Sequence, residues 1–170
     1  ARGEVMVSSM VRLFKKMKLD TQENLGWGPV SLPELEMQTT ACWWTLPDEL
    51  VESYGKEALG AAMVGLAHLM RGIAPLYLMC ASSDISVEYH VRDPFTQKPT
   101  LYLYDCIQGG IGLSDRIYET GTLLFEQALS AVRECPCEQG CPSCVGAGAG
   151  EEAKKTLIDL LERILSGQVG

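Results

Sequence analysis

Residues 135–144 read Cys-Pro-Cys-Glu-Gln-Gly-Cys-Pro-Ser-Cys, which places four cysteines within ten positions in the spacing C-x-C-x3-C-x2-C. Four thiolates close a tetrahedral shell around Zn2+, and spacings this short make the backbone wrap the ion. Gly140 permits unusual backbone angles just before the third cysteine, and the two prolines stiffen the loop. The pattern therefore predicts one structural zinc ion per chain. The predicted ligands are Cys135, Cys137, Cys141 and Cys144.

Two other interpretations of the cysteine cluster remain open. Four thiolates also suit an iron–sulfur cluster, although cluster spacings are usually wider and C-x-C is atypical of them. Four unrelated buried thiols are the second alternative, which the glycine and prolines between the cysteines make unattractive. A shell of four cysteines has no open position, so a zinc ion held by it would be structural rather than catalytic.

The sequence on either side of the cysteines predicts helices. An amphipathic pattern covers residues 112–133, and a second one covers residues 151–165 after a glycine-rich break at 146–150. A zinc knuckle over residues 134–146 would therefore pin the end of one helix to the start of the next. We expect it to lie between the last two helices of the chain.

The region before these helices reads as a mixture of strands and one helix. Apolar spacing predicts a helix at residues 56–71, ending at Gly72, and Gly, Asn and Pro predict a loop at 20–33. Alternating or short apolar runs predict strands at residues 5–19, 37–46, 76–80, 85–91 and 100–105. The expected fold class is α+β, an antiparallel sheet with packed helices, forming a single domain over residues 1–170.

Charge is distributed unevenly along the chain of 170 residues. The net charge is −8, but residues 1–30 hold five basic and three acidic groups. A protein this acidic gains little from counterion release, so we do not expect strong autonomous binding to nucleic acid. The richest basic stretch, Lys15, Lys16 and Lys18, is either a solvated strand face or a contact with a DNA backbone.

A glycine-rich turn joins the last predicted strand to the helix at 112–133. Gly109, Gly110 and Gly112 lie where backbone amides at a helix start can hold a phosphate of a nucleic acid. The alternative is a tight turn that needs positive φ angles, and spacing alone favours this alternative. The chain has no Gly-Lys-Ser or Gly-Lys-Thr, so the turn is not a nucleotide-binding P-loop.

Cysteine usage and hydropathy bear on the cellular environment. Seven cysteines, four of them clustered, are typical of a metal site in a cytosolic protein rather than of a disulfide framework. No apolar run approaches the roughly 20 residues of a membrane span, and we see no signal peptide, so no membrane partner is expected. The chain begins with Ala rather than Met, and we expect it to be a piece of a longer protein.

A catalytic role for the remaining cysteines has little support. Cys42, Cys80 and Cys106 lie in or beside apolar strands, where small buried hydrophobes are the default interpretation. A thiol-dependent hydrolase would need Cys106 to pair with His68 or His90, and neither histidine stands at a motif spacing from it. We therefore expect no catalytic residue in this chain.

Several segments, in order, resemble one protein family. They are Thr-Thr-Ala-Cys-Trp-Trp at 39–44, Gly-Leu-Ala-His-Leu at 65–69, Gly-Gly-Ile-Gly at 109–112 and the cysteine cluster. The series, covering about residues 11–165, resembles the C-terminal zinc-binding domain of mitomycin repair factor A-type DEAD/DEAH-box helicases. Family members often have Pro before the two glycines, where this chain has Gln108. This departure concerns the shape of the turn and not the metal ligands.

The resemblance implies a role. In that family the domain follows two RecA-like motor domains of the same chain, which hydrolyse ATP and translocate 3′ to 5′ on single-stranded DNA in repair. The family's zinc ligands match the four cysteines of the cluster. ATP would bind only in the motor domains, and the protein would be cytoplasmic, near the nucleoid. The alternative is an interaction module that docks a separate helicase chain in a phage-defence complex.

Overall fold

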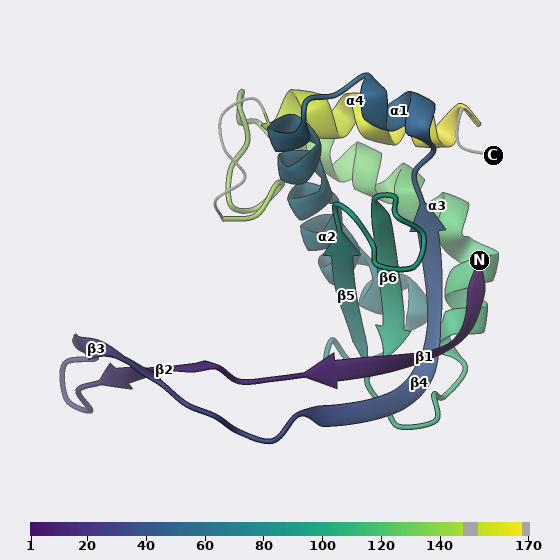
Figure 1. Ribbon diagram of the computed structural model, residues 1–170. Helices are drawn as coiled ribbons and strands as arrows, with labels where there is room; N and C mark the ends of the chain where they lie inside the picture. The colour runs from purple at the N-terminus through teal and green to yellow at the C-terminus, as the bar shows by residue number, and fades with distance from the viewer. Residues whose placement is uncertain (148–152, 168–170) are drawn as a thin grey trace.

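A four-stranded antiparallel sheet forms the body of the protein (Figure 1). The computed structural model describes residues 1–147 and 153–167. The strand order is β1-β4-β6-β5, and every neighbouring pair is antiparallel. The strands are β1 (Arg2–Ser9), β4 (Leu35–Thr45), β5 (Ile85–His90) and β6 (Thr100–Asp105).

The helices pack on one face of this sheet, so the expected α+β class is confirmed (Figure 1). Trp44 of β4 points to this side, with its ring 5.1 Å from the ring of Phe125 in an edge-on contact. A Cβ atom on Gly121 would lie 2.9 Å from the Trp44 ring, so the glycine lets the helix approach the sheet. The helices are α1 (Asp48–Glu52), α2 (Lys56–Leu78), α3 (Leu113–Glu134) and α4 (Ala153–Leu165).

The core lies between the sheet and the three long helices. Leu103 of β6, Leu66 of α2, Leu124 of α3 and Leu160 of α4 are at most 1% exposed. Each comes from a different element and they belong to one buried cluster. Burial of such side chains contributes about 1.5–3 kcal/mol each, so the four elements hold one another in place.

A two-stranded ribbon projects from the body (Figure 1). It consists of β2 (Leu13–Met17) and β3 (Asn24–Pro29), and we call residues 12–30 the arm. The predicted single strand at 5–19 is wrong, because the structure has two strands there. The first, β1, ends at Ser9 and pairs with β4, and the second, β2, begins at Leu13 and pairs with β3. The predicted loop at 20–33 is wrong over Asn24–Pro29, which form β3. The turn before this strand closes when the Lys18 amide donates to the Glu23 carbonyl at 2.9 Å. This closure lets a segment rich in glycine pair as a strand.

Helix α2 is longer than its sequence predicts. The helix continues past Gly72 to Leu78, so the predicted strand at 76–80 is wrong. Pro75 lies inside the helix, where it removes only one backbone hydrogen bond, and Leu78 is 1% exposed. The helix ends at Met79, which adopts a left-handed φ of 52° while its amide donates to the Pro75 carbonyl. Burial of the extra turn outweighs the signals that favoured an earlier stop.

The sequence was expected to contain no apolar run of membrane-spanning length. Helix α2 is nevertheless long and apolar enough to cross a membrane, by length and composition alone. It is the one helix among residues 1–147 and 153–167 that does so. More than half of that apolar window, 56%, is buried inside the fold. This is how the core helix of a folded domain packs, since its apolar faces contact α3, α4 and β5.

Replacement of Leu157 by Ala tests the packing of α4 on α2. Leu157 is fully buried, and a Cβ atom on Gly65 would lie 2.8 Å from its Cδ2 atom. We expect Leu157→Ala to lower the free energy of unfolding by about 2–5 kcal/mol, because it leaves a cavity. Urea denaturation followed by circular dichroism measures this. The control Leu76→Ala, at a side chain that is 75% exposed, should change it by less than about 1 kcal/mol, and equal losses would contradict the packing.

Candidate metal centre

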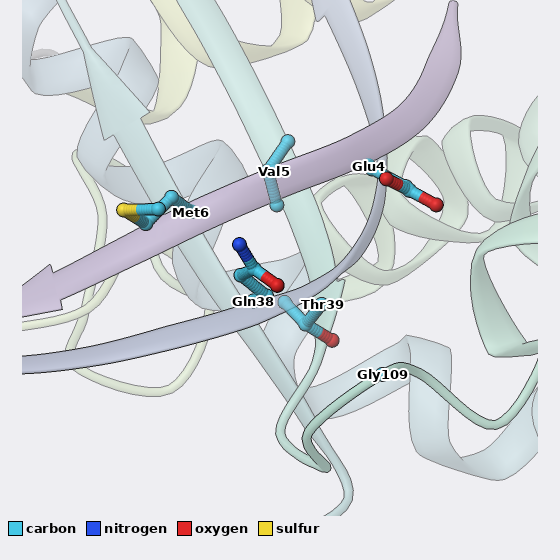
Figure 2. A pocket seen from close by; sticks show the side chains of 6 residues that line it. All are labelled: Glu4, Val5, Met6, Gln38, Thr39 and Gly109. Carbon is cyan, nitrogen blue, oxygen red and sulfur yellow. The ribbon is translucent and has the colours of Figure 1, made fainter.

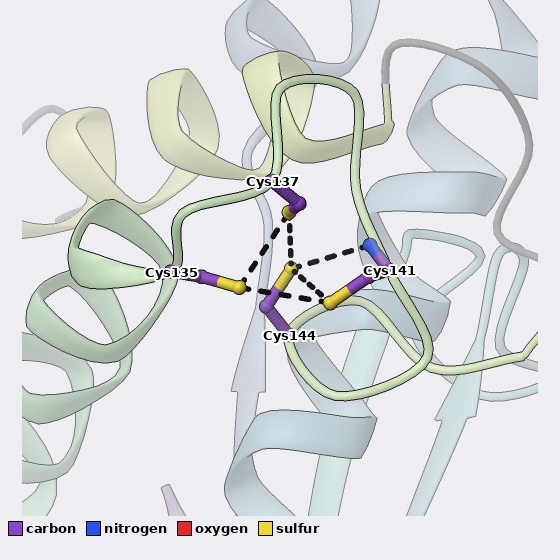
Figure 3. A group of neighbouring side chains, drawn as sticks. All are labelled: Cys135, Cys137, Cys141 and Cys144. Carbon is purple, nitrogen blue, oxygen red and sulfur yellow. Dashed lines mark hydrogen bonds between the residues drawn. The ribbon is translucent and has the colours of Figure 1, made fainter.

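Four cysteine sulfurs meet in the loop that joins α3 to the segment before α4 (Figure 3). Helix α3 ends at Glu134, and Cys135 turns the chain into an extended conformation. The Sγ atoms of all four cysteines lie within 4.8 Å of one another. Neighbouring sulfurs are 3.4–3.7 Å apart, as between Cys137 and Cys144 at 3.4 Å and Cys141 and Cys144 at 3.7 Å.

These distances fit a tetrahedral zinc ion. A Zn–S length of about 2.3 Å gives a tetrahedron whose edges are about 3.8 Å. The sulfur separations approach this value, and the sulfurs converge on a common point from both sides of the loop (Figure 3). Thiolates are the donors that zinc prefers in closed, structural shells. The described residues offer no fifth ligand group to this cluster, so the chemistry of the donor set is that of a fold-stabilising ion.

The local backbone is shaped for this cluster. The Val145 amide donates to the Cys141 carbonyl at 3.0 Å, which forms a tight turn between the last two cysteines. Gly140 has a φ of 125°, and a Cβ atom there would lie 2.8 Å from Val145 Cγ2. Only glycine meets both constraints without strain. The structure therefore confirms that Gly140 is needed for an unusual backbone angle just before the third cysteine.

The thiols of the cluster differ in acidity. Hydrogen bonds from the backbone of Cys144, then of Ser143, lower the pKa of the Cys141 thiol to about 7. Burial raises the pKa of the Cys144 thiol to about 12. A metal must displace these protons, and Cys141 gives up its proton more readily than Cys144 does.

Lys154 supplies positive charge beside the cluster. Its side chain is 8% exposed, and its Nζ atom donates to the carbonyls of Cys135 and Cys137 at 2.6 Å each. Its own backbone amide donates to the Gln139 carbonyl at 3.2 Å. Four thiolates on Zn2+ carry a net charge of −2, which a buried ammonium group offsets. Lys154 also fastens the first turn of α4 to the loop.

Sequence reasoning missed Lys154. It lies ten positions beyond Cys144, and no ligand spacing includes it. A lysine in the first turn of a helix also opposes the usual preference for acidic residues there. That anomaly was the only signal in the sequence that pointed to a special role.

The glycine-rich turn is closed by an internal carboxylate. Asp105 is fully buried, and its Oδ2 atom accepts hydrogen bonds from the Ile111 amide at 2.6 Å and the Leu113 amide at 3.3 Å. A carboxylate from β6 thus occupies the place that a bound phosphate would take at this helix start. The amides of Gly109 and Gly110 donate to the carbonyls of Gln38 and Ile107. Each glycine of the turn, Gly109, Gly110 and Gly112, has a positive φ, of 82°, 74° and 87°.

The surroundings of the turn also disfavour an anion. A small pocket of about 250 Å3 lies beside Gly109, between β1 and β4 (Figure 2). Among the described residues that line it, Glu4 is the charged one. A Cβ atom on Gly110 would lie 2.3 Å from Thr40 Oγ1. The glycines are therefore explained by backbone shape and close packing, whereas a phosphate contact stays a prediction.

The three lysines lie elsewhere. Lys15 and Lys16 belong to β2 of the arm and Lys18 follows it, whereas the glycine turn and the cysteines lie on the body (Figure 1). All three side chains are exposed. The Lys15 ammonium lies 5.6 Å from the centre of the Trp27 ring, within the range of a cation–π contact. The structure thus brings the four cysteines together. It does not bring the three lysines of the arm to the glycine-rich turn, so the predicted nucleic-acid contacts do not form one site.

The candidate thiol hydrolase gains no support from the geometry. Burial, with the nearby carboxylate of Asp105, raises the pKa of the Cys106 thiol, which disfavours a nucleophilic thiolate. His68 Nε2 lies 3.1 Å from the Ser143 carbonyl, and the His90 ring lies edge-on to Tyr102. These contacts direct both histidines toward partners other than Cys106.

Replacement of two ligands tests the metal centre. We expect wild-type protein to hold one zinc per chain by elemental analysis. Cys135→Ser with Cys144→Ser should lose the zinc and the cooperative unfolding transition together, because the binding energy of a structural zinc is folding energy. The control pair, Cys80→Ser with Cys106→Ser, should retain both. A folded protein with no metal, or iron in place of zinc, would contradict this assignment.

Replacement of Lys154 by Met tests the buried ammonium group. Methionine has a similar length but no charge, so the thiolate cluster would lose its compensating cation. We expect Lys154→Met to weaken zinc binding about 10–100-fold, measured by competition with a chromophoric chelator. Lys155→Met at the adjacent exposed position is the matched control and should leave the affinity unchanged. The same loss in both variants, or in neither, would show that Lys154 has no specific role.

Known proteins share this arrangement. Residues 66–145 match the family model described as the MrfA Zn-binding domain. The uncharacterized ATP-dependent helicase YprA of Bacillus subtilis is 36% identical over 163 residues, which are 95% of this chain and 22% of the helicase. The uncharacterized protein MJ1572.1 of Methanocaldococcus jannaschii is 31% identical over 112 residues, which are 61% of this chain and 100% of that protein.

Solved structures agree with the sequence comparisons. The crystal structure of the DUF1998 helicase MrfA bound to DNA superposes with a TM-score of 0.77 at 36% identity, over 96% of this chain and 22% of that one. A second crystal structure of MrfA superposes with a TM-score of 0.63 at 27% identity. The chain thus spans about a fifth of the helicases it matches. With its four gathered cysteines and this match in sequence and fold, the chain belongs to the family of MrfA zinc-binding domains.

Proposed function

We propose that this chain is the zinc-binding accessory domain of an ATP-dependent DNA helicase. The observation that carries the proposal is the 36% identity to helicases over nearly the whole chain. The chain spans 22% of their length, so the motor would lie in other domains of the same polypeptide. ATP would bind and be hydrolysed there, while this domain has a structural rather than a catalytic role. The parent protein would act in DNA repair, in the cytoplasm near the nucleoid.

The domain would brace the motor domains through its rigid body. The cysteine cluster follows α3 directly, and Lys154 in α4 donates hydrogen bonds to two carbonyls of the same loop. A zinc ion held there would therefore fix two helices to each other at one end. Such a clamp resists bending, which suits an element that supports moving domains.

The arm would guide single-stranded DNA. Arg12, Lys15, Lys16 and Lys18 are all exposed on it, although the chain as a whole has a net charge of −8. Trp27 is 65% exposed beside Lys15, which offers an aromatic surface next to a cation. In proteins that bind single-stranded nucleic acid, the phosphates contact basic side chains and the bases stack on aromatic rings. These groups stand on a narrow ribbon that projects from the body, which supports the proposal because a strand would have room to approach them (Figure 1).

Charge reversal on the arm tests this role. We expect Lys16→Glu with Lys18→Glu to weaken binding to a fluorescent 20-nucleotide oligothymidine, measured by anisotropy at several salt concentrations. Loss of two phosphate contacts should reduce the slope of log K against log salt by about 1.4. The control pair Lys56→Glu with Lys155→Glu makes the same change in net charge on the body. An equal effect of both pairs would reject a specific role for the arm.

A second candidate function is an interaction module that docks a separate helicase chain, as in a phage-defence complex. The match to MJ1572.1 favours it, because this chain aligns with that relative over 100% of the relative's length. This candidate differs from the first in what the arm does. A docking module should be indifferent to the charge of Lys16 and Lys18 in the oligothymidine assay, yet bind a helicase supplied as a separate chain.

A further inference from the structure

The face of the sheet opposite the helices carries aromatic side chains. Trp43 of β4 stands directly across from Tyr102 of β6, and their ring centres are 5.9 Å apart. Adjacent residues on a strand point to opposite faces, so Trp43 faces outward while Trp44 packs on Phe125. Both outward rings are only partly buried. In the described part of the chain, no helix packs over them (Figure 1).

These rings form the floor of a groove of about 670 Å3. One wall is β1, and the other is the loop between β5 and β6, where Phe95 is 89% exposed. Tyr104 continues the floor, one row along from Tyr102 on the same face of β6. We call this the aromatic groove, with Trp43, Tyr102, Tyr104 and Phe95 as its aromatic residues.

The charges of the aromatic groove have one sign. Glu4, Glu88 and Asp93 line it, and among the described residues that do so none is Lys or Arg. Burial opposes ionisation of Asp93, but hydrogen bonds from the Thr96 and Phe95 amides and the Tyr102 hydroxyl outweigh it and lower the pKa of its carboxyl. Asp93 therefore stays ionised, and the groove is acidic as well as aromatic.

One carboxylate in the groove is free for a ligand. Glu88 of β5 pairs directly with Tyr102 in the strand register, so Trp43, Tyr102 and Glu88 form one row across three strands. Side chains directly opposite on neighbouring strands have Cβ atoms about 4.5–5.5 Å apart. Glu88 is exposed and makes no hydrogen bond or ion pair with any described residue. The row therefore presents two aromatic rings followed by an unpaired carboxylate.

This chemistry complements a guanidinium group. Arginine stacks flat on aromatic rings and pairs with carboxylates through its planar fork of donors. A nucleic-acid strand would instead bring phosphates against the carboxylates of Glu88 and Asp93, which repel them. We propose that the aromatic groove binds an arginine-bearing segment of a partner polypeptide, with one guanidinium stacked over Trp43 and Tyr102 and paired with Glu88. The basic arm and the acidic groove would then bind opposite kinds of partner.

A titration with short peptides tests this inference on the whole 170-residue chain. The probe is acetyl-Gly-Arg-Gly-Arg-Gly-Arg-Gly-amide, and the readout is the indole N–H resonance of Trp43 in nitrogen-15 NMR spectra. We expect a saturable shift with the arginine peptide and none with the matching glutamate peptide. Glu88→Gln should weaken binding about three- to fivefold, as loss of an exposed ion pair does. The opposite charge in Glu88→Lys should abolish saturation.

The controls separate the groove from general acidity. Glu119→Gln, at an exposed position on α3, changes net charge equally and should leave peptide affinity unaltered. Glu88 is exposed, so its variants should fold, and their spectra report this directly. No saturation with the arginine peptide, or equal weakening by Glu119→Gln, would overturn the proposal. Saturable shifts of Trp43 with a ten-nucleotide oligothymidine would also overturn it, because the groove would then be a base-stacking surface.

Discussion

The four thiols at the end of α3 are the constraint on which the arrangement of the helices depends. Their sulfurs converge within 4.8 Å, although the segment that carries them has no regular secondary structure. Thiolates this close repel one another, and only a cation removes that cost. A Zn2+ ion there would offset half of the four negative charges, and Lys154 in α4 would offset part of the rest. Electrostatics at this loop therefore helps to hold the described start of α4 to the end of α3.

The sheet divides the molecule into two sides of different character. Trp44 and Trp43 are neighbours in sequence, yet one is locked against Phe125 and the other lines an open groove. Gly65 and Gly121 allow the helices to pack closely on the inner side. The three long helices lie on that side, so in the part of the chain that the structure describes no helix covers the aromatic rings of the outer side (Figure 1). A domain built in this way has its core on one face of the sheet and aromatic side chains that solvent can reach on the other.

The sequence predicted well the features that depend on residues close to one another in the chain. The cysteines, Gly140 and the helix after the glycine turn depend on residues within a few positions of one another, and their spacing shows the geometry directly. What it predicted poorly depends on distant contacts. Gly72 and Pro75 indicate a helix end, but burial of Leu78 against the core keeps the chain helical. The strand at Asn24–Pro29 forms only because the turn before it closes a ribbon.

Lys154 and Asp105 show a further limit of sequence reasoning. Each is a charged residue that is almost or fully buried, and each satisfies backbone groups of a segment elsewhere in the chain. A glycine turn before a helix resembles a phosphate cradle in sequence, because the spacing is the same whether the anion is a ligand or a side chain. In this fold Asp105 from β6 is the anion. The Ile111 and Leu113 amides are thus satisfied within the fold, and the basic side chains of the arm lie elsewhere.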